Sequence, residues 1–256
     1  VSPSGNTDWP NCTNESKTCH PHTALENAVA GDTVYFLDGK YTVTDSPSSG
    51  DGYEYPAWQP ANSGTESSPI TFKALNDKSA HLTRTISSGV GASMIGTYLE
   101  NGIVWDGFTI TVKNDSGDYS IPKNKFYSTD YSALKNCDIR GGSHDTGGSI
   151  NYEGVRVENA NHFLMENCTV YGFIETSGNH NTSGYKSYSS SNVTVKNCEF
   201  YGNTLDIYVK GPDHSIITIE NNYLHSNNPM RLEVWGVNTC SDYHIINNVI
   251  TGTVYV

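Results

Sequence analysis

The chain has 256 residues, of which 36% are hydrophobic and only 16% are charged, and it contains 24 glycines and 17 tyrosines. This mixture argues against a helical protein, which uses more Ala, Leu, Glu and Lys, and it favours short strands joined by turns. The formal net charge of -12 argues against a nucleic-acid partner, although it leaves room for a local basic groove. No apolar run is long enough for a transmembrane segment, so we expect no membrane partner.

The N-terminal stretch, residues 1–30, is predicted to form a cap on a single domain that spans 1–256. Cys12 and Cys19 lie close together in a polar segment, and we expect a disulfide between them. Such a disulfide is typical of a secreted protein, and a mature secreted chain would have lost its signal peptide before Val1.

A short helix is predicted within this cap. Thr23 followed three residues later by Glu26 forms a capping box, which indicates a helix that ends at Gly31. Its apolar face, Leu25, Ala28 and Val29, would cover the open first coil of a stacked β-structure. The first coils would follow as strands at 33–36, 41–44, 70–75 and 81–86, with residues 45–68 as a Ser-, Gly- and Pro-rich loop.

A repeat governs the rest of the chain. Its units read apolar-x-apolar-x-Asn, and the key position recurs at intervals of 24 to 31 residues. A period of this length that contains only strands predicts a solenoid, in which each coil stacks on the last. Leucine-rich repeats share this period, but Leu is sparse here, so we predict an all-β, right-handed parallel β-helix. The key positions are Asp106, Asn136, Asn167, Asn197, Asn221 and Asn247.

Stacking places equivalent residues above one another. An Asn at each corner can then donate its amide hydrogen to the Asn of the next coil, which predicts an amide ladder. Cys137, Cys168 and Cys198 follow these Asn residues by one position and are interpreted as small buried thiols rather than metal ligands, with Asn222 and Asn248 continuing the same column.

A column of basic residues is predicted eleven positions before four of the repeat Asn residues. These positions hold Lys125, Arg156, Lys186 and Lys210. Coils stack at a spacing of about 4.8 Å, so adjacent cations would repel one another. A chain that keeps such a column can use it to bind a linear polyanion. The alternative is that acids such as Glu158 and Asp206 neutralise the row as a solvated salt-bridge face.

Residues that could contact a sugar chain lie near this column. We expect outward-facing aromatic rings to stack on sugar rings and outward-facing polar groups to bind the polymer. The predicted substrate-binding residues are Lys125, Tyr152, His180, Tyr188, Tyr208, Arg231 and Trp235.

The segment GYKSYSSSNVTVKNCEFYGN (184–203) resembles the Lys-Ser strand of β-helix polysaccharide lyases, namely the alginate lyases and chondroitinase-B-type enzymes. The opening coils, GDTVYFLDGKYTV (31–43) and PITFKAL (69–75), are similar to theirs, including small one-domain alginate lyases. The resemblance implies that Lys186 is the base and that Lys210 assists it, where the family usually has Arg. The carboxylates that bind calcium in some members are not evident before Lys186, so we expect no metal or other cofactor.

β-Elimination from a uronate fits these residues without the resemblance. The reaction needs the uronate carboxylate neutralised, the C5 proton removed and the leaving O4 protonated. Neighbouring cations lower the pKa of a Lys, which favours Lys186 as the base. Arg156 or Lys210 would hold the carboxylate, and Tyr185, Tyr188, Tyr208 or His180 would protonate O4. The predicted catalytic residues are Lys186, Lys210, Arg156 and Tyr185.

The sequence therefore predicts a secreted, monomeric lyase that acts on an acidic polysaccharide, with alginate preferred on the family resemblance alone. Pectate or glucuronan lyase activity on the same fold is an alternative. A glycoside hydrolase would need paired carboxylates, for which Asp206, Glu158 and Glu233 are candidates. A non-catalytic carbohydrate-binding solenoid is the last alternative.

Overall fold

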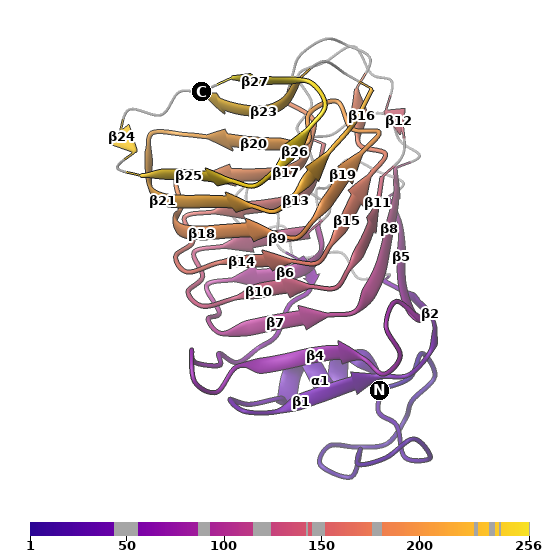
Figure 1. The fold of residues 1–256 in the computed structure, drawn as a ribbon. Helices are drawn as coiled ribbons and strands as arrows, with labels where there is room; N and C mark the ends of the chain where they lie inside the picture. Colours follow the sequence, from indigo (N-terminus) through magenta and orange to yellow (C-terminus); the bar gives the residue numbers. More distant parts are fainter. Residues whose placement is uncertain are drawn as a thin grey trace.

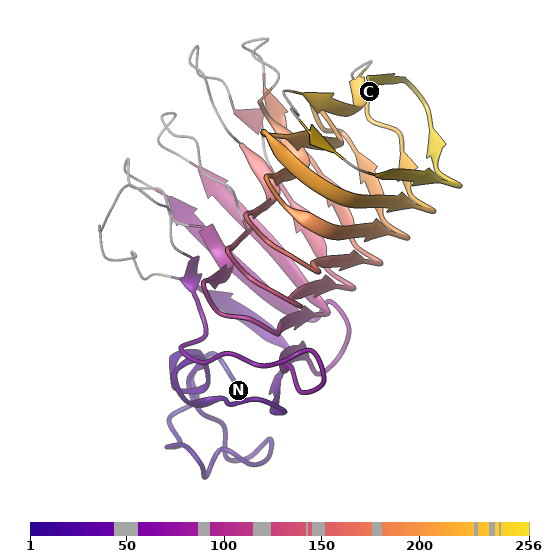
Figure 2. The ribbon, with the colours of Figure 1, turned by 90° about the vertical axis from the view of Figure 1, so that its left-hand side faces the viewer.

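A computed structural model describes residues 1–43, 56–86, 93–114, 124–141, 143–144, 152–175, 181–227, 230–235, 239–240 and 242–255. The chain passes in turn through three parallel sheets, and each coil adds one strand to each sheet. Figure 1 shows the strands stacked along one axis, and Figure 2 shows the same stack from the side, with the N-terminal end at the bottom. The fold class, a right-handed parallel β-helix with a short N-terminal helix, is as predicted.

The first sheet is nine-stranded, with β24 and β25 both pairing with β21. Its strands are β1 (Thr33–Phe36), β4 (Ile70–Ala74), β7 (Ile103–Asp106), β10 (Ala133–Lys135), β14 (Leu164–Glu166), β18 (Ser191–Lys196), β21 (Asp213–Glu220), β24 (Thr239–Cys240) and β25 (Tyr243–Ile246).

The second sheet is eight-stranded. Its strands are β2 (Gly39–Thr42), β5 (Ala80–Ile86), β8 (Phe108–Asn114), β11 (Asp138–Arg140), β15 (Thr169–Tyr171), β19 (Glu199–Tyr201), β22 (Tyr223–Leu224) and β26 (Val249–Ile250).

The third sheet is also eight-stranded and carries the candidate site. Its strands are β3 (Pro56–Trp58), β6 (Ser93–Tyr98), β9 (Asn124–Tyr127), β13 (Glu153–Glu158), β17 (Ser183–Tyr188), β20 (Ile207–Lys210), β23 (Met230–Trp235) and β27 (Thr253–Tyr255). A small separate sheet pairs β12 (Ser143–His144) with β16 (Ile174–Glu175). The segment 45–68 was predicted as a loop, but β3 lies within it and pairs with β6.

The N-terminal cap contains the expected disulfide between Cys12 and Cys19, whose Cα atoms are 5.4 Å apart. The helix α1 (Pro21–Asn27) lies beside β1 and β4 at this end of the solenoid (Figure 1). Its N-cap is His20, so the predicted start at Thr23 is wrong. Pro21 explains the earlier start, because its fixed φ suits the first helical position and it needs no hydrogen-bond acceptor there.

The apolar side of α1 is shorter than the sequence indicates. Leu25 and Ala28 are buried in the core, whereas Val29 lies beyond the end of the helix and is exposed. The helix ends at Asn27 rather than at Gly31. The helix therefore covers the first coil with one turn of apolar residues.

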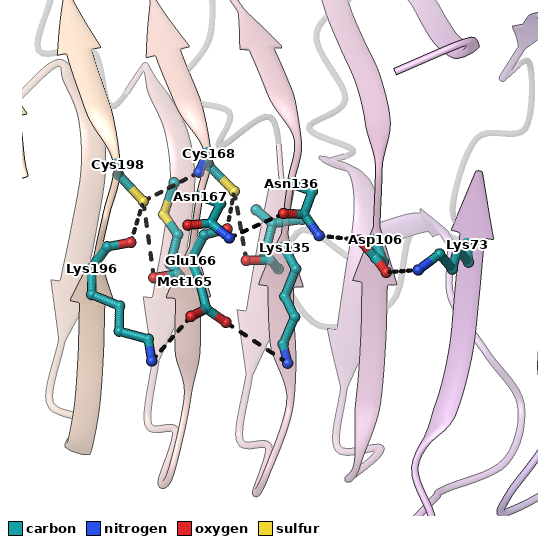
Figure 3. A network of polar contacts seen from close by, with 11 residues as sticks. Lys73, Asp106, Lys135, Asn136, Met165, Glu166, Asn167, Cys168, Lys196 and Cys198 are labelled. Atoms are coloured by element: carbon teal, nitrogen blue, oxygen red, sulfur yellow. Dashed lines mark hydrogen bonds and ion pairs between the residues drawn. The ribbon is translucent and has the colours of Figure 1, made fainter. Parts of the chain in front are cut away.

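The repeat Asn residues form the corners between the first and second sheets. Asn136, Asn167, Asn197, Asn221 and Asn247 all have φ between 53 and 55°. This left-handed conformation disfavours most L-residues but is tolerated by Asn, which explains why Asn recurs there. The expected amide ladder is present where Asn167 Nδ2 donates to Asn136 Oδ1 at 3.2 Å (Figure 3).

The predicted register is wrong by one residue in the earliest unit. Asp106 lies opposite Lys135, and the corner in that coil is Gly107, with φ of 82°. Glycine adopts this conformation without strain, so it replaces Asn there. Asn136 Nδ2 nevertheless donates to Asp106 Oδ1 at 2.6 Å, which continues the polar ladder into this coil.

The three thiols after the corners are buried, as predicted. Burial raises the pKa of Cys168 well above its usual value, which keeps the thiol neutral. Asn222 continues this column, accepting a hydrogen bond from the Cys198 N–H at 2.9 Å and donating to the Val195 carbonyl at 2.9 Å. Asn248 Oδ1 accepts in turn from the Asn222 N–H at 2.8 Å. These contacts indicate that the column packs the coils together.

No helix among the described residues is both long enough and apolar enough to cross a membrane.

Candidate functional site

Three cations stand in register on the outer face of the third sheet. Lys125 of β9 lies opposite Arg156 of β13, and Arg156 lies opposite Lys186 of β17. Neighbouring parallel strands are about 4.8 Å apart, so the backbones bring these charges close together. The predicted basic column is confirmed for these three residues.

The fourth cation is displaced from the predicted column. Lys186 lies opposite Tyr208, and Lys210 lies opposite Tyr188. The cause is the length of the next turn, because Ser191 and Ser215 are in register: three positions separate Tyr188 from Ser191, whereas five separate Lys210 from Ser215. Counting from the repeat Asn therefore misplaces Lys210 by two residues.

Asn181 brings Lys210 back to the cluster. Lys210 Nζ donates to Asn181 Oδ1 at 3.0 Å, and Lys186 Nζ donates to the Asn181 carbonyl at 2.9 Å. The two amines therefore share one residue in the segment that precedes β17. Asn181 was not among the predicted site residues, and nothing in its sequence context distinguishes it.

Two carboxylates of β13 lie among the cations. Glu158 Oε2 is 3.0 Å from Arg156 Nε and 3.6 Å from Lys125 Nζ. Glu153 forms an ion pair with Lys186 Nζ, and its Oε1 is 4.0 Å from Arg156 Nη1. The alternative that acids neutralise the row is thus realised in part, by Glu158.

Asp206 does not share in this neutralisation. Its side chain was expected to face outward, but it is fully buried. The Asp206 carboxylate accepts hydrogen bonds from Ser226 Oγ and from Asn203 Nδ2, the latter at 3.0 Å. It therefore belongs to a buried polar cluster at another corner of the coil.

Glu153 reaches the outer face because of a local irregularity in β13. An ideal Cβ on Gly154 would lie 2.8 Å from the Phe173 ring, so the Gly154 position faces the interior, as Val155 does. Two successive inward positions place Glu153 on the same side as Arg156. Strict alternation would have directed Glu153 into the core, and the only sequence signal was a glycine inside a strand, which often marks a bulge.

Lys186 is the most deeply buried cation of the group, with 2% of its surface exposed. Burial lowers the pKa of its amine, and the charges of Arg156 and Lys210 act in the same direction. The Glu153 carboxylate opposes them by stabilising the ammonium form. The expectation that neighbouring cations favour a neutral Lys186 therefore holds, but desolvation is the larger cause.

Aromatic rings lie against each cation. Lys125 Nζ is 5.2 Å from the centre of the Tyr127 ring, and the Arg156 guanidinium is 5.7 Å from that of Tyr188. Tyr208 lies between two amines, 5.3 Å from Lys186 Nζ and 5.5 Å from Lys210 Nζ. These rings stabilise the cations through their negative faces.

The aromatic surface continues beyond the cations in both directions. Trp235 lies opposite Lys210 and is 59% exposed. On the N-terminal side, the rings of Tyr98 and Tyr127 stack at 5.1 Å. Neither tyrosine was predicted, although Tyr127 follows Lys125 by two residues, the spacing that places both on one face of a strand.

Two predicted tyrosines lie in the core instead. Tyr185 is adjacent to Lys186 in the chain, so its side chain points to the opposite face of β17, where it is fully buried. Burial raises the pKa of its phenol, and its predicted role as the proton donor is wrong. Tyr152 packs against Phe173, with ring centres 5.2 Å apart, so it cannot stack on a sugar.

Two other predicted residues cannot be placed in the same way. His180 lies outside the described residues. Arg231 lies in β23, whose register against β27 shifts between Met230 and Leu232, and its side chain also lies outside the described part.

The described residues around Lys186 do not offer a calcium site. Calcium needs six to eight oxygen ligands. Glu153 Oε1 and the two Asn181 oxygens face the amines of Lys186 and Lys210, which would repel a second cation. Among the described residues, no group of three or more His, Cys, Asp or Glu side chains is arranged to hold a metal.

No family model and no curated protein sequence matches this chain. Its fold does match solved structures. Pectate lyase Pel9A superposes over 98% of this chain and 61% of its own, with a TM-score of 0.59 and 14% identity. The chain shares the fold of pectate lyase Pel9A. It spans about three fifths of the length of that enzyme.

Two further solved structures are similar at lower TM-scores. An alginate lyase from Paenibacillus sp. str. FPU-7 has a TM-score of 0.47 and 14% identity, covering 91% of this chain and 93% of its own. A rhamnogalacturonan lyase has a TM-score of 0.41 and 12% identity, covering 96% and 85%. The match to pectate lyase Pel9A confirms the expected resemblance to β-helix polysaccharide lyases for the fold.

Proposed function

We propose that this protein is a polysaccharide lyase that cleaves an acidic polysaccharide by β-elimination, with Lys186 as the base. The observation that carries the proposal is the register of Lys125, Arg156 and Lys186 on one outer face, with Arg156 in the middle and Lys186 the most deeply buried of the three. A β-helix shared with a pectate lyase supports it, because that fold hosts such a reaction.

The reaction can be followed on named groups. Arg156 would bind the uronate carboxylate through its guanidinium, which matches carboxylate geometry and delocalises the charge that develops on it. The neutral amine of Lys186 would take the C5 proton. The electron pair of that C–H bond then forms the C4=C5 double bond as the bond from C4 to O4 breaks. The leaving O4 takes up a proton, so protons balance over the reaction.

Tyr208 is the best-placed proton donor. Its ring lies between the amines of Lys186 and Lys210, and it is almost fully buried. Burial raises the pKa of its phenol, with a further contribution from Glu233, so the hydroxyl stays protonated at neutral pH. A donor of this kind can release its proton only to a stronger base, such as a departing alkoxide.

The polymer would lie along the solenoid axis, across the strands. The exposed ring of Trp235 on one side of the cations and the stacked rings of Tyr98 and Tyr127 on the other offer surfaces for successive sugars. Alginate is the first substrate to test, on the family resemblance of the Lys186 strand. Secretion and a monomeric state are part of the same proposal.

A glycoside hydrolase is less compatible with the site. Its two carboxylates must be available to the glycosidic bond. Here Glu158 is paired with Arg156 and Lys125, and Asp206 is buried in hydrogen bonds to Asn203 and Ser226.

The experiment that tests the proposal is a substrate screen with purified protein on alginate, pectate, glucuronan and chondroitin. A lyase produces an unsaturated uronate, which absorbs in the ultraviolet, whereas a hydrolase produces reducing ends without that absorbance. We expect the ultraviolet signal on at least one polymer. Reducing ends without absorbance would support a hydrolase, and binding without either product would support a carbohydrate-binding solenoid.

A further inference from the structure

We propose that Glu153 is a positioning residue of this site, which holds the Lys186 amine beside Arg156 and stabilises its ammonium form, an inference that rests on the proposed lyase function. Glu153 does not need to touch the substrate in this role. It acts through Lys186.

The contacts of Glu153 place it beside two of the cations. Its side chain is fully buried, and its Oε1 atom forms the ion pair with Lys186 Nζ and lies 4.0 Å from Arg156 Nη1. Among the described residues, it is the carboxylate that contacts the Lys186 amine. A carboxylate buried to this degree is costly unless cations compensate it, so its retention beside Lys186 needs a reason.

The same contacts fix the direction of a long, flexible side chain. Lys186 donates to the Asn181 carbonyl at 2.9 Å and to Glu153, one partner preceding it in its own coil and one from the coil before. Glu153 and Asn181 therefore both constrain the direction in which the Lys186 amine points. Without Glu153, the Lys186 amine would keep its hydrogen bond to the Asn181 carbonyl but would lose its ion pair.

The charges around Lys186 show what else Glu153 does. From β13, Glu153 stabilises the ammonium while Arg156 opposes it; from β20, Lys210 also opposes it and the neutral phenol of Tyr208 lies against it. Glu158 is directed to Arg156 and Lys125, and Glu233 lies opposite Tyr208. Glu153 therefore raises the pKa of Lys186, whereas desolvation and the charges of Arg156 and Lys210 lower it.

This balance predicts a defined pH dependence. The base form of Lys186 is the neutral amine, so activity falls as pH decreases through its pKa. Glu153 raises that pKa, because its negative charge stabilises the ammonium form. Removing the charge therefore lowers the pKa and moves the acidic limb of the pH–rate profile to lower pH.

The test compares the pH dependence of kcat and kcat/KM for the full chain and for Glu153→Gln. The amide keeps an acceptor for the Lys186 amine but loses the charge. We expect the acidic limb to move down by about one pH unit or more. Glu153→Ala, which removes the acceptor as well, should show the same displacement and a further loss of kcat of about tenfold or more.

Glu158→Gln is the matched control. It removes a carboxylate from the same strand and from the same Arg156, without touching Lys186. Its acidic limb should stay at the wild-type pH. An acidic limb that does not move in Glu153→Gln would overturn the proposal, because a purely structural role lowers the rate equally at every pH. The proposal would also fail if the acidic limb moved by the same amount in Glu158→Gln.

Two further measurements separate this inference from the proposed function. Titration of the Lys186 side chain by NMR in the full chain needs no activity, so a lower pKa in Glu153→Gln supports the inference even if no polymer is cleaved. If Glu153→Gln does not fold, the variant Glu153→Asp tests the positioning role instead. It keeps the charge but shortens the reach, so kcat should fall while the limb stays near the wild-type pH; an unchanged kcat would contradict positioning.

Discussion

Two columns of charge run along this solenoid on different sheets, and they are built in opposite ways. On the first sheet, charges of alternating sign lie opposite one another from coil to coil, whereas on the third sheet three cations follow in succession. Figure 3 shows part of the alternating column, with Glu166 between Lys135 and Lys196. That column is Lys73, Asp106, Lys135, Glu166, Lys196 and Glu220.

The difference lies in where the compensating charges come from. In the alternating column each strand neutralises its neighbours, and most of the side chains remain partly exposed. Among the described residues around the third-sheet cations, the carboxylates in ion pairs are both supplied by β13, while Lys125 and Lys186 are buried. Stacked coils can therefore neutralise charge by alternating its sign from strand to strand. The third sheet does not show this alternation. This contrast supports the proposal that the third-sheet cluster serves catalysis.

The largest expected effect is the loss of activity when Lys186 of the third sheet is replaced. Lys186→Arg keeps a cation beside Glu153 but stays protonated, so it cannot act as the base. We expect kcat/KM to fall by about 10²- to 10⁴-fold while the melting temperature changes little. Lys135→Arg on the first sheet is the control and should leave the rate unchanged. A Lys186→Arg variant with the wild-type rate would contradict the assigned role.

A second prediction tests the paired donors of the Arg156 guanidinium. Arg156→Lys keeps the positive charge but loses the planar pair of donors that matches a carboxylate. We expect KM for the polymer to rise by about tenfold, with a smaller change in kcat. The measurement is steady-state kinetics on whichever polymer is cleaved. Lys196→Arg, the reverse exchange on the alternating column, should change neither parameter.

The smallest effect should appear in stability. Glu166→Lys converts the alternating column locally into three successive cations, without the carboxylates that β13 supplies on the third sheet. We expect a loss of about 1 kcal/mol in the free energy of unfolding, smaller in high salt, because these side chains are partly exposed. Chemical denaturation at low and high salt measures it. Glu166→Gln should lose less, and an equal loss in both variants would show that like-charge repulsion is not the cause.

The sequence by itself determined the solenoid and, for much of the chain, which residues are equivalent in successive coils. The period of the Asn residues predicted the coils, because a corner in the left-handed region recurs once per coil and few residue types tolerate it. Equal spacing from those corners also placed Lys125, Arg156 and Lys186 in one column, since their coils have turns of matching length. Local pattern is sufficient wherever successive coils are alike.

Only the tertiary structure decided the details of the site. Two extra residues in one turn displaced Lys210, and the inward Gly154 brought Glu153 to the outer face. Tyr185 was predicted to be catalytic although its neighbour Lys186 already occupied the outward position. Register between coils is set by hydrogen bonds between residues more than twenty positions apart, and which face a side chain takes follows from that register. Counting residues along the chain predicts neither the register nor the face of a side chain once a turn changes length or the alternation within a strand is interrupted.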